Sequence, residues 1–265
     1  MRIGAVNYLN TKPLVYQLDQ LAPGAEIIYD YPSRLADGLA AGNFDVALVP
    51  SIELWTHPDY EIVSDACIGC RGPVLSVKLF MRVPPQQIRS LALDEGSRTS
   101  IALALILLER VCGVRPDLQP LRIGTGLNET AADALLLIGD RAMHSPTGRF
   151  HEVWDLGDQW FQWTGLPFVF ATWTSRGGDG VAPLAKVLGQ ARDAGVAHLH
   201  EIARVEAGPL GLTEPQCYHY LHDNLNFRLG PDERRGLELF FEHTSALGLA
   251  AATADIGQAA APGER

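Results

Sequence analysis

The residues best suited to bind an anion stand where an apolar, strand-like segment ending at Asp94 leads into an apolar helical run: Ser97, Arg98, Thr99 and Ser100. The first backbone N–H groups of a helix have no intrahelical partner and carry the positive end of the helix dipole. Three hydroxyls and a guanidinium would add donors at that point. We therefore expect this turn to bind a carboxylate or phosphate group. The alternative is that Ser97 merely caps the helix.

A second set of polar residues follows other predicted strands or lies in extended segments: Asn10, Thr11, Ser51, Ser76 and Asp140. In a parallel α/β sheet, ligands bind at the edge where the carboxyl ends of the strands meet. We expect Asn10 and Ser76 to act in catalysis, and the other three to bind substrate. The alternatives remain open, since Asn10 also fits a strand end, Ser76 a strand interior and Asp140 a helix cap.

Composition limits the function classes. The chain has 265 residues with 47% hydrophobic content, enough for one large domain or two lobes. A net charge of −10 argues against a nucleic-acid partner. A small anionic ligand is still compatible, because a few hydrogen bonds at the site outweigh distant, screened surface charges. The first ten residues do not resemble a signal peptide, and the apolar run Ile101–Leu108 is too short to span a bilayer, so we expect a cytoplasmic protein without a membrane partner.

Cysteine and histidine spacing gives little support for a metal or redox site. Cys67 and Cys70 form a CIGC motif, and Cys217, His219 and His222 lie close together. A structural zinc site needs four ligands, usually as two closely spaced pairs, and neither group supplies them. We expect no bound metal.

Short strands alternate with helices, which predicts an α/β fold. The strand candidates are Ile3–Val6, Glu26–Tyr29, Asp45–Val49, Leu91–Asp94, Leu121–Gly124 and Ala134–Gly139. Ser33 is expected to cap a short helix, and longer helices are predicted over 181–207, 214–226 and 231–247. Two extended segments, Val74–Val83 and Phe168–Ser175, are interpreted as crossings between a lobe of residues 1–83 plus 173–265 and a lobe of residues 84–172. Ligand sites favour such an interdomain crevice.

Several stretches resemble the chorismate dehydratase family of the futalosine route to menaquinone, namely RIGAVNYLNTKPL, DVALVPSIE, GPVLSVKLF, LALDEGSRTS, LLIGDRAM, GDQWFQWTGLPFVFATW and GLTEPQCYHYLHDNLNFRL. The resemblance implies a type II periplasmic-binding-protein fold, used in the cytoplasm as an enzyme that converts chorismate to 3-[(1-carboxyvinyl)oxy]benzoate and water. It implies no cofactor and no metal. The alternatives are the similar 1,4-dihydroxy-6-naphthoate synthase of the same pathway and a non-catalytic solute-binding or sensor protein.

If chorismate is the substrate, its two carboxylates require two groups of donors. We assign the turn at residues 97–100 to the ring carboxylate, where negative charge accumulates as the proton leaves. Candidate bases are Glu53, His57 and His144. The alternative base is the enolpyruvyl carboxylate of the substrate itself. The sequence leaves the oligomeric state open.

Overall fold

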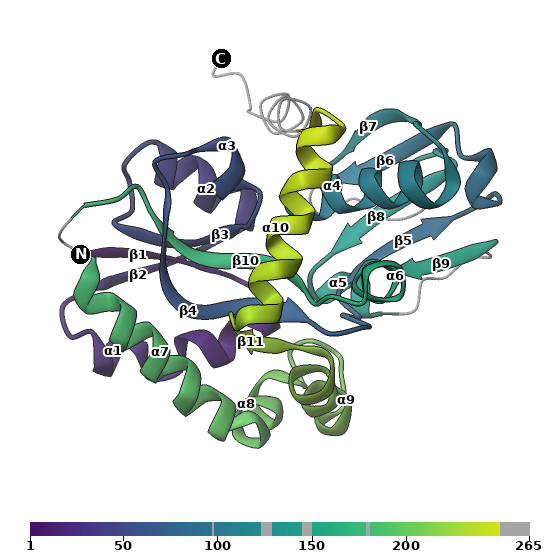
Figure 1. Cartoon of the computed structure of the whole chain (residues 1–265). Coiled ribbons are helices and arrows are strands. Elements are labelled where there is room, and N and C mark those ends of the chain that lie inside the picture. Colours follow the sequence, from purple (N-terminus) through teal and green to yellow (C-terminus); the bar gives the residue numbers. More distant parts are fainter. Residues whose placement is uncertain (97, 123–128, 145–149, 179–180, 250–265) are drawn as a thin grey trace, which may run out of the picture.

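A computed structural model describes residues 1–96, 98–122, 129–144, 150–178 and 181–249. Within these residues the strands form two mixed sheets, one of six strands and one of five, which lie side by side (Figure 1). The first sheet has the order β11-β4-β10-β3-β1-β2, with β1 (Arg2–Val6), β2 (Glu26–Asp30), β3 (Val46–Pro50), β4 (Glu61–Cys70), β10 (Phe168–Ser175) and β11 (Asn226–Arg228). The second has the order β7-β6-β8-β5-β9, with β5 (Val77–Met81), β6 (Ser90–Asp94), β7 (Asp117–Leu121), β8 (Ala134–Ile138) and β9 (Glu152–Asp155).

The chain changes sheets at two places. It leaves the first sheet after Cys70 and enters the second at Val77, and it returns between α6 (Leu156–Thr164) and Phe168. Both changes lie earlier than the boundaries expected at 83/84 and 172/173. Of the two segments interpreted as crossings, the first contains residues 74–76 of the change of sheet followed by β5, which pairs with β8 and β9. The second forms β10, which pairs with β3 and β4.

Hydrophobic pattern explains which strands are central. All five residues of β3 and all eight of β10 are buried, as expected for strands covered on both faces. β1 runs parallel to both β2 and β3, whereas β10 is antiparallel to β3 and β4. The predicted strand Leu121–Gly124 is displaced, since β7 ends at Leu121 and residues 123–124 lie outside the described residues. Strand β4 was not predicted.

Helices cover both sheets. They are α1 (Leu18–Leu21), α2 (Pro32–Ala40), α3 (Glu53–Thr56), α4 (Arg98–Leu107), α5 (Asp140–Met143), α6, α7 (Ala182–Ala197), α8 (Leu199–Glu206), α9 (Glu214–His219) and α10 (Pro231–Ala246). Shorter helical turns of the 3-10 type occur at Leu9–Val15 and Pro85–Gln87, and π-helical turns occur at Leu108–Cys112 and Tyr220–Asn224.

The structure corrects three helix predictions. The helix expected over 214–226 is α9 followed by the π-helical turn Tyr220–Asn224, and Asn226 begins β11. The long helix expected over 181–207 is divided at His198, which ends α7 and precedes α8. Helix α2 begins at Pro32, so Ser33 lies inside its first turn and does not cap it. Helix α10 follows its prediction closely. It contacts β10 of the first sheet and α4 beside the second, and thereby ties the two halves together (Figure 1).

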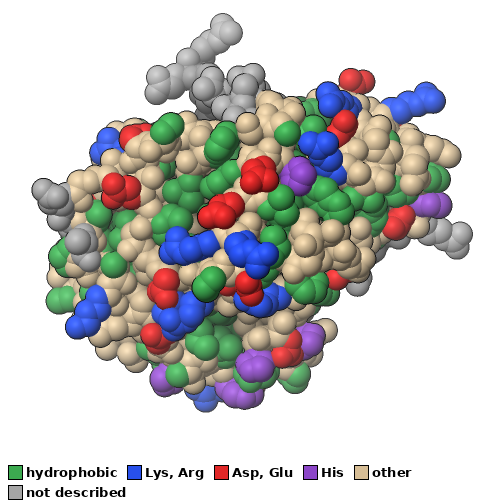
Figure 2. Space-filling model, in the orientation of Figure 1, with side chains coloured by type: hydrophobic (Ala, Val, Ile, Leu, Met, Phe, Trp, Pro, Cys, Tyr) green, Lys and Arg blue, Asp and Glu red, His purple; other side chains and the backbone are tan. Residues whose placement is uncertain are grey.

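The face shown in Figure 2 carries mixed charge, and histidine side chains gather at its lower edge, over α8 and α9. None of the helices among the described residues is long and apolar enough to cross a membrane.

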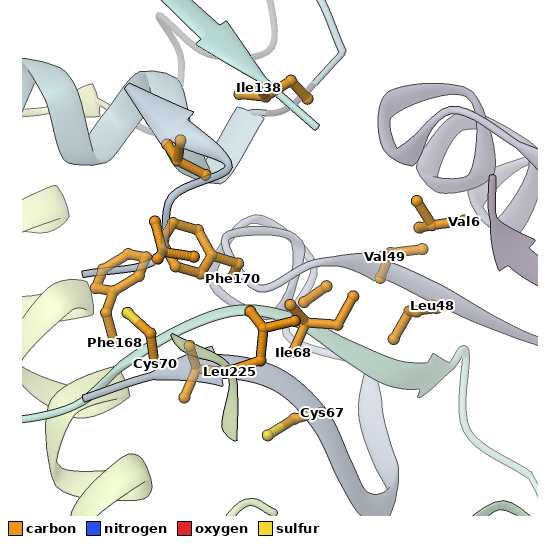
Figure 3. Close-up of a cluster of buried hydrophobic side chains, with 14 of the residues drawn as sticks. Val6, Leu48, Val49, Cys67, Ile68, Cys70, Ile138, Phe168, Phe170 and Leu225 are labelled. Carbon is orange, nitrogen blue, oxygen red and sulfur yellow. The ribbon is translucent and has the colours of Figure 1, made fainter. Parts of the chain in front are cut away.

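Buried side chains of both sheets and of the helices that cover them belong to one hydrophobic core cluster. Figure 3 shows Val6, Ile68 and Phe170 of the first sheet and Ile138 of the second directed toward one region. Each of these four side chains is buried. The same region borders the cavity described next.

Candidate active site

A cavity lies between the two sheets and is lined by residues of both lobes. Much of its wall is apolar, including Val6, Ile68, Ile138 and Phe170 (Figure 3). Among the described residues, the polar side chains that line it are Tyr8, Asn10, Ser76 and Ser100. A wall of this kind suits a flat, mostly apolar ring that carries a few polar groups.

A strained turn presents Ser76 to the cavity. Leu75 has a positive φ of 60°, and the N–H of Ser76 donates to the carbonyl of Val74 at 2.8 Å, so the three residues form a γ-turn. The carboxylate of Asp155 accepts the N–H groups of Val74 and Leu75 at 2.9 and 2.6 Å. Because strained backbone persists only where its surroundings hold it, Asp155 fixes the position of Ser76. Burial raises the pKa of Asp155, and its backbone hydrogen bonds oppose that shift.

Behind the wall, Ser76 and Asn10 meet Tyr220. The Tyr220 hydroxyl donates to Ser76 Oγ at 2.9 Å, and the Asn10 side chain hydrogen-bonds the same tyrosine. Thr11 Oγ1 donates to Asn10 Oδ1 at 3.3 Å. Burial raises the pKa of the Tyr220 phenol well above its usual range, so the group stays protonated. The bond between Tyr220 and Ser76 joins residues that are 144 positions apart.

Tyr8 extends from the end of β1 against the other lobe. A Cβ atom added at Gly139 would lie 2.7 Å from the Tyr8 ring, and Gly139 has a φ of 69°, so only glycine fits there. Burial, followed by the nearby Asp94 carboxylate, raises the pKa of Tyr8. Asp94 itself is buried and forms an ion pair with Arg141. Tyr8 therefore closes one end of the cavity as a neutral hydroxyl.

The turn at the start of α4 mainly contacts the other lobe. Arg98 forms ion pairs with Glu53 of α3, at 3.0 Å, and with Asp37 of α2. Thr99 Oγ1 accepts the N–H of Ile52 at 3.1 Å and lies 3.4 Å from Ser51 Oγ. The Ser51 hydroxyl donates to the carbonyl of Val169 at 2.7 Å. Ser97 lies outside the described residues.

Asp140 makes a similar contact between the lobes. Its carboxylate accepts the N–H of Leu9 at 3.1 Å, and burial raises the pKa of the group. Asp140 is also the first residue of α5, where a carboxylate is favoured by the helix dipole.

The expected site residues thus separate into two sets. Asn10, Ser76 and Ser100 line the cavity, and Thr11 supports Asn10 from behind. Ser51, Arg98, Thr99 and Asp140 have partners within the protein. The substrate-binding roles assigned to these residues stay predictions. Tyr8 and Tyr220 were missed. Tyr8 stands between the candidate strand and Asn10, which was a usable signal, whereas nothing in the sequence connects Tyr220 with Ser76.

None of the three candidate bases is a cavity-lining residue within the described part of the chain. Glu53 is buried against Arg98, and His57 Nε2 lies 3.6 Å from the same carboxylate. His144 is exposed and lies near Gly211.

The cysteine and histidine motifs are structural or lie on the surface. Cys67 and Cys70 are buried on β4 and point to opposite sides of it, as an odd separation in a strand requires (Figure 3). Burial raises the pKa of both thiols, which disfavours the reactive thiolate. His219 and His222 share the carboxylate of Asp223. Among the described residues, no group of three or more His, Cys, Asp or Glu side chains is arranged to hold a metal ion.

Comparisons with known proteins support a single family. A family model described as menaquinone biosynthesis matches residues 1–246. The chain is 34% identical to a chorismate dehydratase from Thermus thermophilus, over 93% of this chain and 95% of the relative. It is 25% identical to a chorismate dehydratase from Campylobacter jejuni, over 94% of this chain and 100% of the relative.

The structural comparison identifies the fold. The crystal structure of the periplasmic aliphatic sulphonate binding protein SsuA from Escherichia coli superimposes with a TM-score of 0.59. It shares 14% sequence identity, and the match covers 94% of this chain and 87% of that structure. The expected periplasmic-binding-protein fold is confirmed.

Proposed function

The chain belongs to the menaquinone biosynthesis family, and from this premise we propose that it is a chorismate dehydratase, a lyase that converts chorismate to 3-[(1-carboxyvinyl)oxy]benzoate and water. The observation that carries the proposal is the 34% identity to the Thermus thermophilus chorismate dehydratase over nearly the full length of both chains. The fold alone would not be enough to assign an enzymatic activity, because proteins that only bind a solute have the same two-lobed architecture.

The chemistry of the cavity wall supports this substrate. Chorismate has one six-membered ring, two carboxylates and a hydroxyl, and we expect the ring to lie against the apolar wall formed by Val6, Ile68 and Phe170. Asn10, Ser76 and Ser100 offer neutral hydrogen-bond donors for its oxygens. Donors without charge stabilise an anion when they are already oriented, because no reorganisation is then needed during the reaction.

The reaction removes the ring hydrogen at the carbon bearing the enolpyruvyl ether, together with the neighbouring hydroxyl. The electron pair of the C–H bond becomes part of the aromatic ring, and the hydroxyl leaves as water after it gains a proton. Formation of the aromatic ring supplies the driving force. Charge that develops during loss of the proton spreads through the conjugated double bond to the ring carboxylate. Donors on that carboxylate therefore stabilise the transition state more than the ground state.

We propose that the enolpyruvyl carboxylate of chorismate takes the ring proton. The proposal is supported by the placement of Glu53, His57 and His144, which have contacts away from the cavity wall. Asn10 and Ser76 then act by binding and orienting substrate oxygens, and the apolar wall excludes water from the ionised intermediate. Glu53→Gln, His57→Ala and His144→Ala should each retain substantial turnover. A loss of more than ~10⁴-fold in kcat for one of them, with chorismate still bound, would identify a protein base instead.

Incubation of the purified protein with chorismate alone tests the function. We expect a new aromatic absorbance and a product lighter than chorismate by one water, identified by mass spectrometry and NMR. Turnover should persist in the presence of a chelator. Binding of chorismate without conversion would instead indicate a solute-binding or sensor protein, and activity restored only by added zinc would contradict the metal-free chemistry.

The cytoplasmic location expected from the sequence stays a proposal. Fractionation of cells that produce the protein, with marker proteins for each compartment, tests it. Recovery in the cytoplasmic fraction is expected, and recovery in the periplasm or membrane fraction would contradict it.

A further inference from the structure

Tyr220 lies directly behind the cavity wall and has no role in the chemistry described so far. Its side chain is completely buried, and it begins the π-helical turn Tyr220–Asn224. Such turns are rare and are frequent at functional sites. The phenol oxygen is 2.9 Å from Ser76 Oγ, and Ser76 lines the cavity.

The hydrogen bonds around Tyr220 form a series in which each group donates to the next. Thr11 donates to Asn10 Oδ1, and an Asn10 amide N–H donates toward Tyr220, because the single proton of the Tyr220 phenol is already donated to Ser76. The Tyr220 hydroxyl in turn donates to Ser76 Oγ. Each group therefore gives its proton to the next one along the series, and the series ends at the cavity. Hydrogen bonds arranged in this way polarise and strengthen one another.

This direction fixes what Ser76 offers to a ligand. A serine hydroxyl has one proton and two acceptor positions, and Tyr220 occupies one acceptor position. The Ser76 proton therefore points away from Tyr220. Since Asp155 holds the backbone of the γ-turn and Tyr220 holds the hydroxyl, both the place and the rotation of the Ser76 group are set before substrate binds.

We propose that Tyr220 is a positioning residue for the dehydration, and that it holds Ser76 as a hydrogen-bond donor to a substrate oxygen that gains negative charge. The inference rests on the proposed function of the cavity. Tyr220 does not line the cavity and acts only through Ser76. An oriented donor at a developing charge needs no rearrangement in the transition state, so the contribution should appear in kcat rather than in KM.

A double-mutant cycle between Tyr220→Phe and Ser76→Ala tests the proposal. Tyr220→Phe keeps the ring and removes only the hydroxyl. We expect kcat to fall by about tenfold or more while KM changes by less than about threefold. In a protein that already carries Ser76→Ala, Tyr220→Phe should lower kcat no further, because there is no hydroxyl left to orient. Losses that multiply in the double variant, or a normal kcat for Tyr220→Phe, would overturn the proposal.

Tyr218→Phe is the matched control, because Tyr218 lies two residues earlier on the same segment and stacks on His200 at the surface. It should leave both kcat and KM unchanged. The same cycle measured by urea unfolding needs no substrate and tests the hydrogen bond itself. If the effects of the two substitutions on unfolding free energy are coupled but the protein does not turn over chorismate, the proposed function is refuted and the hydrogen bond between Tyr220 and Ser76 is confirmed. Absence of coupling would refute the positioning role whatever the activity.

Discussion

Two clusters of hydroxyls border the gap between the lobes, and they differ in what their donors contact. At the Ser76 cluster, the hydrogen bonds of Thr11, Asn10 and Tyr220 lead toward the cavity. At the start of α4, Arg98 and Thr99 are bonded to α2, α3 and the end of β3. The first cluster is therefore suited to bind a ligand, whereas the second holds the two lobes together.

The comparison shows that residue types do not by themselves identify a binding site. The α4 turn has more donors in a shorter stretch, yet its guanidinium and one hydroxyl already have partners. Ser100, on the same turn, does line the cavity, so the helix contributes to both functions. What separates the two clusters is where their polar groups lie: Asn10 and Ser76 line the cavity, whereas Arg98 and Thr99 contact the opposite lobe.

The largest expected effect is on stability. Arg98→Met would leave Glu53, whose side chain is 4% exposed, without its ion-pair partner. Because an unpaired buried charge is costly, we expect the free energy of unfolding to fall by about 3–5 kcal/mol in urea denaturation. Arg115→Met is the control, since the Arg115 pair with Glu109 has a largely exposed arginine and should contribute about 1 kcal/mol or less. Equal losses for the two variants would show that Arg98 does not join the lobes.

Ser76→Ala should have the largest effect on catalysis. Removal of one oriented donor at a developing charge typically lowers kcat by about 10²–10³-fold. The variant also leaves the buried Tyr220 hydroxyl without an acceptor, so the free energy of unfolding should fall by about 1–3 kcal/mol. Circular dichroism melting curves, recorded beside the steady-state kinetics, show that the variant is still folded under assay conditions. Ser64→Ala, at a buried serine that donates to the carbonyl of Ala185, is the control and should retain full activity. If the kcat of Ser76→Ala is within about threefold of that of the unaltered enzyme, the Ser76 cluster does not take part in the mechanism.

Substitutions of the neighbouring residues Thr99 and Ser100 on the α4 turn should affect different properties, namely stability for Thr99 and catalysis for Ser100. Thr99→Val removes the acceptor of the Ile52 N–H, and an unsatisfied buried N–H costs about 1–3 kcal/mol of folding stability. Its effect on kcat/KM should be less than about threefold. Ser100→Ala should instead reduce kcat/KM by about tenfold. If Thr99→Val abolished activity in a stable protein, the turn would bind substrate as the sequence suggested.

The smallest effect concerns alkaline pH. Burial raises the pKa of Tyr8 and of Tyr220, so both phenols stay protonated in the folded protein when they ionise in the unfolded chain, near pH 10. The unfolded state then binds fewer protons, and stability should fall as pH rises above about 10, by about 1 kcal/mol per tyrosine at pH 11. Urea unfolding between pH 9 and 11 measures the slope. Tyr220→Phe should reduce that slope, and an unchanged slope would contradict the burial of an ionisable phenol at this position.

Local sequence pattern predicted much of the first and second sheets. The strands near residues 3–6, 26–29, 45–49, 91–94 and 134–139 were recognisable because they are short, largely apolar and followed by turn residues. β5 and β10 were misinterpreted as linkers, since a long extended run looks the same whether or not it has partners on both sides. β4 was missed because its CIGC sequence was considered only as a possible metal or redox motif.

The site was harder to predict for a related reason. Asn10 and Ser76 were identifiable as polar residues at strand ends or in extended segments. The partners of Arg98 lie 45 and 61 residues away, and Tyr220 lies 144 residues from Ser76. Such pairings depend on how the lobes pack, which spacing along the chain does not encode. The sequence therefore indicated the hydrogen-bond donors but not which groups of the protein each donor contacts.

A crystal structure of the protein with 3-[(1-carboxyvinyl)oxy]benzoate bound would test the central claim most directly. We expect the ring to lie against Phe170 and Ile68, with Asn10 and Ser76 hydrogen-bonded to its oxygens. Tyr220 should still donate to Ser76, and Arg98 should still pair with Glu53. A product carboxylate bound by Arg98 and Thr99, with the contacts to Glu53 and Ile52 broken, would contradict the account.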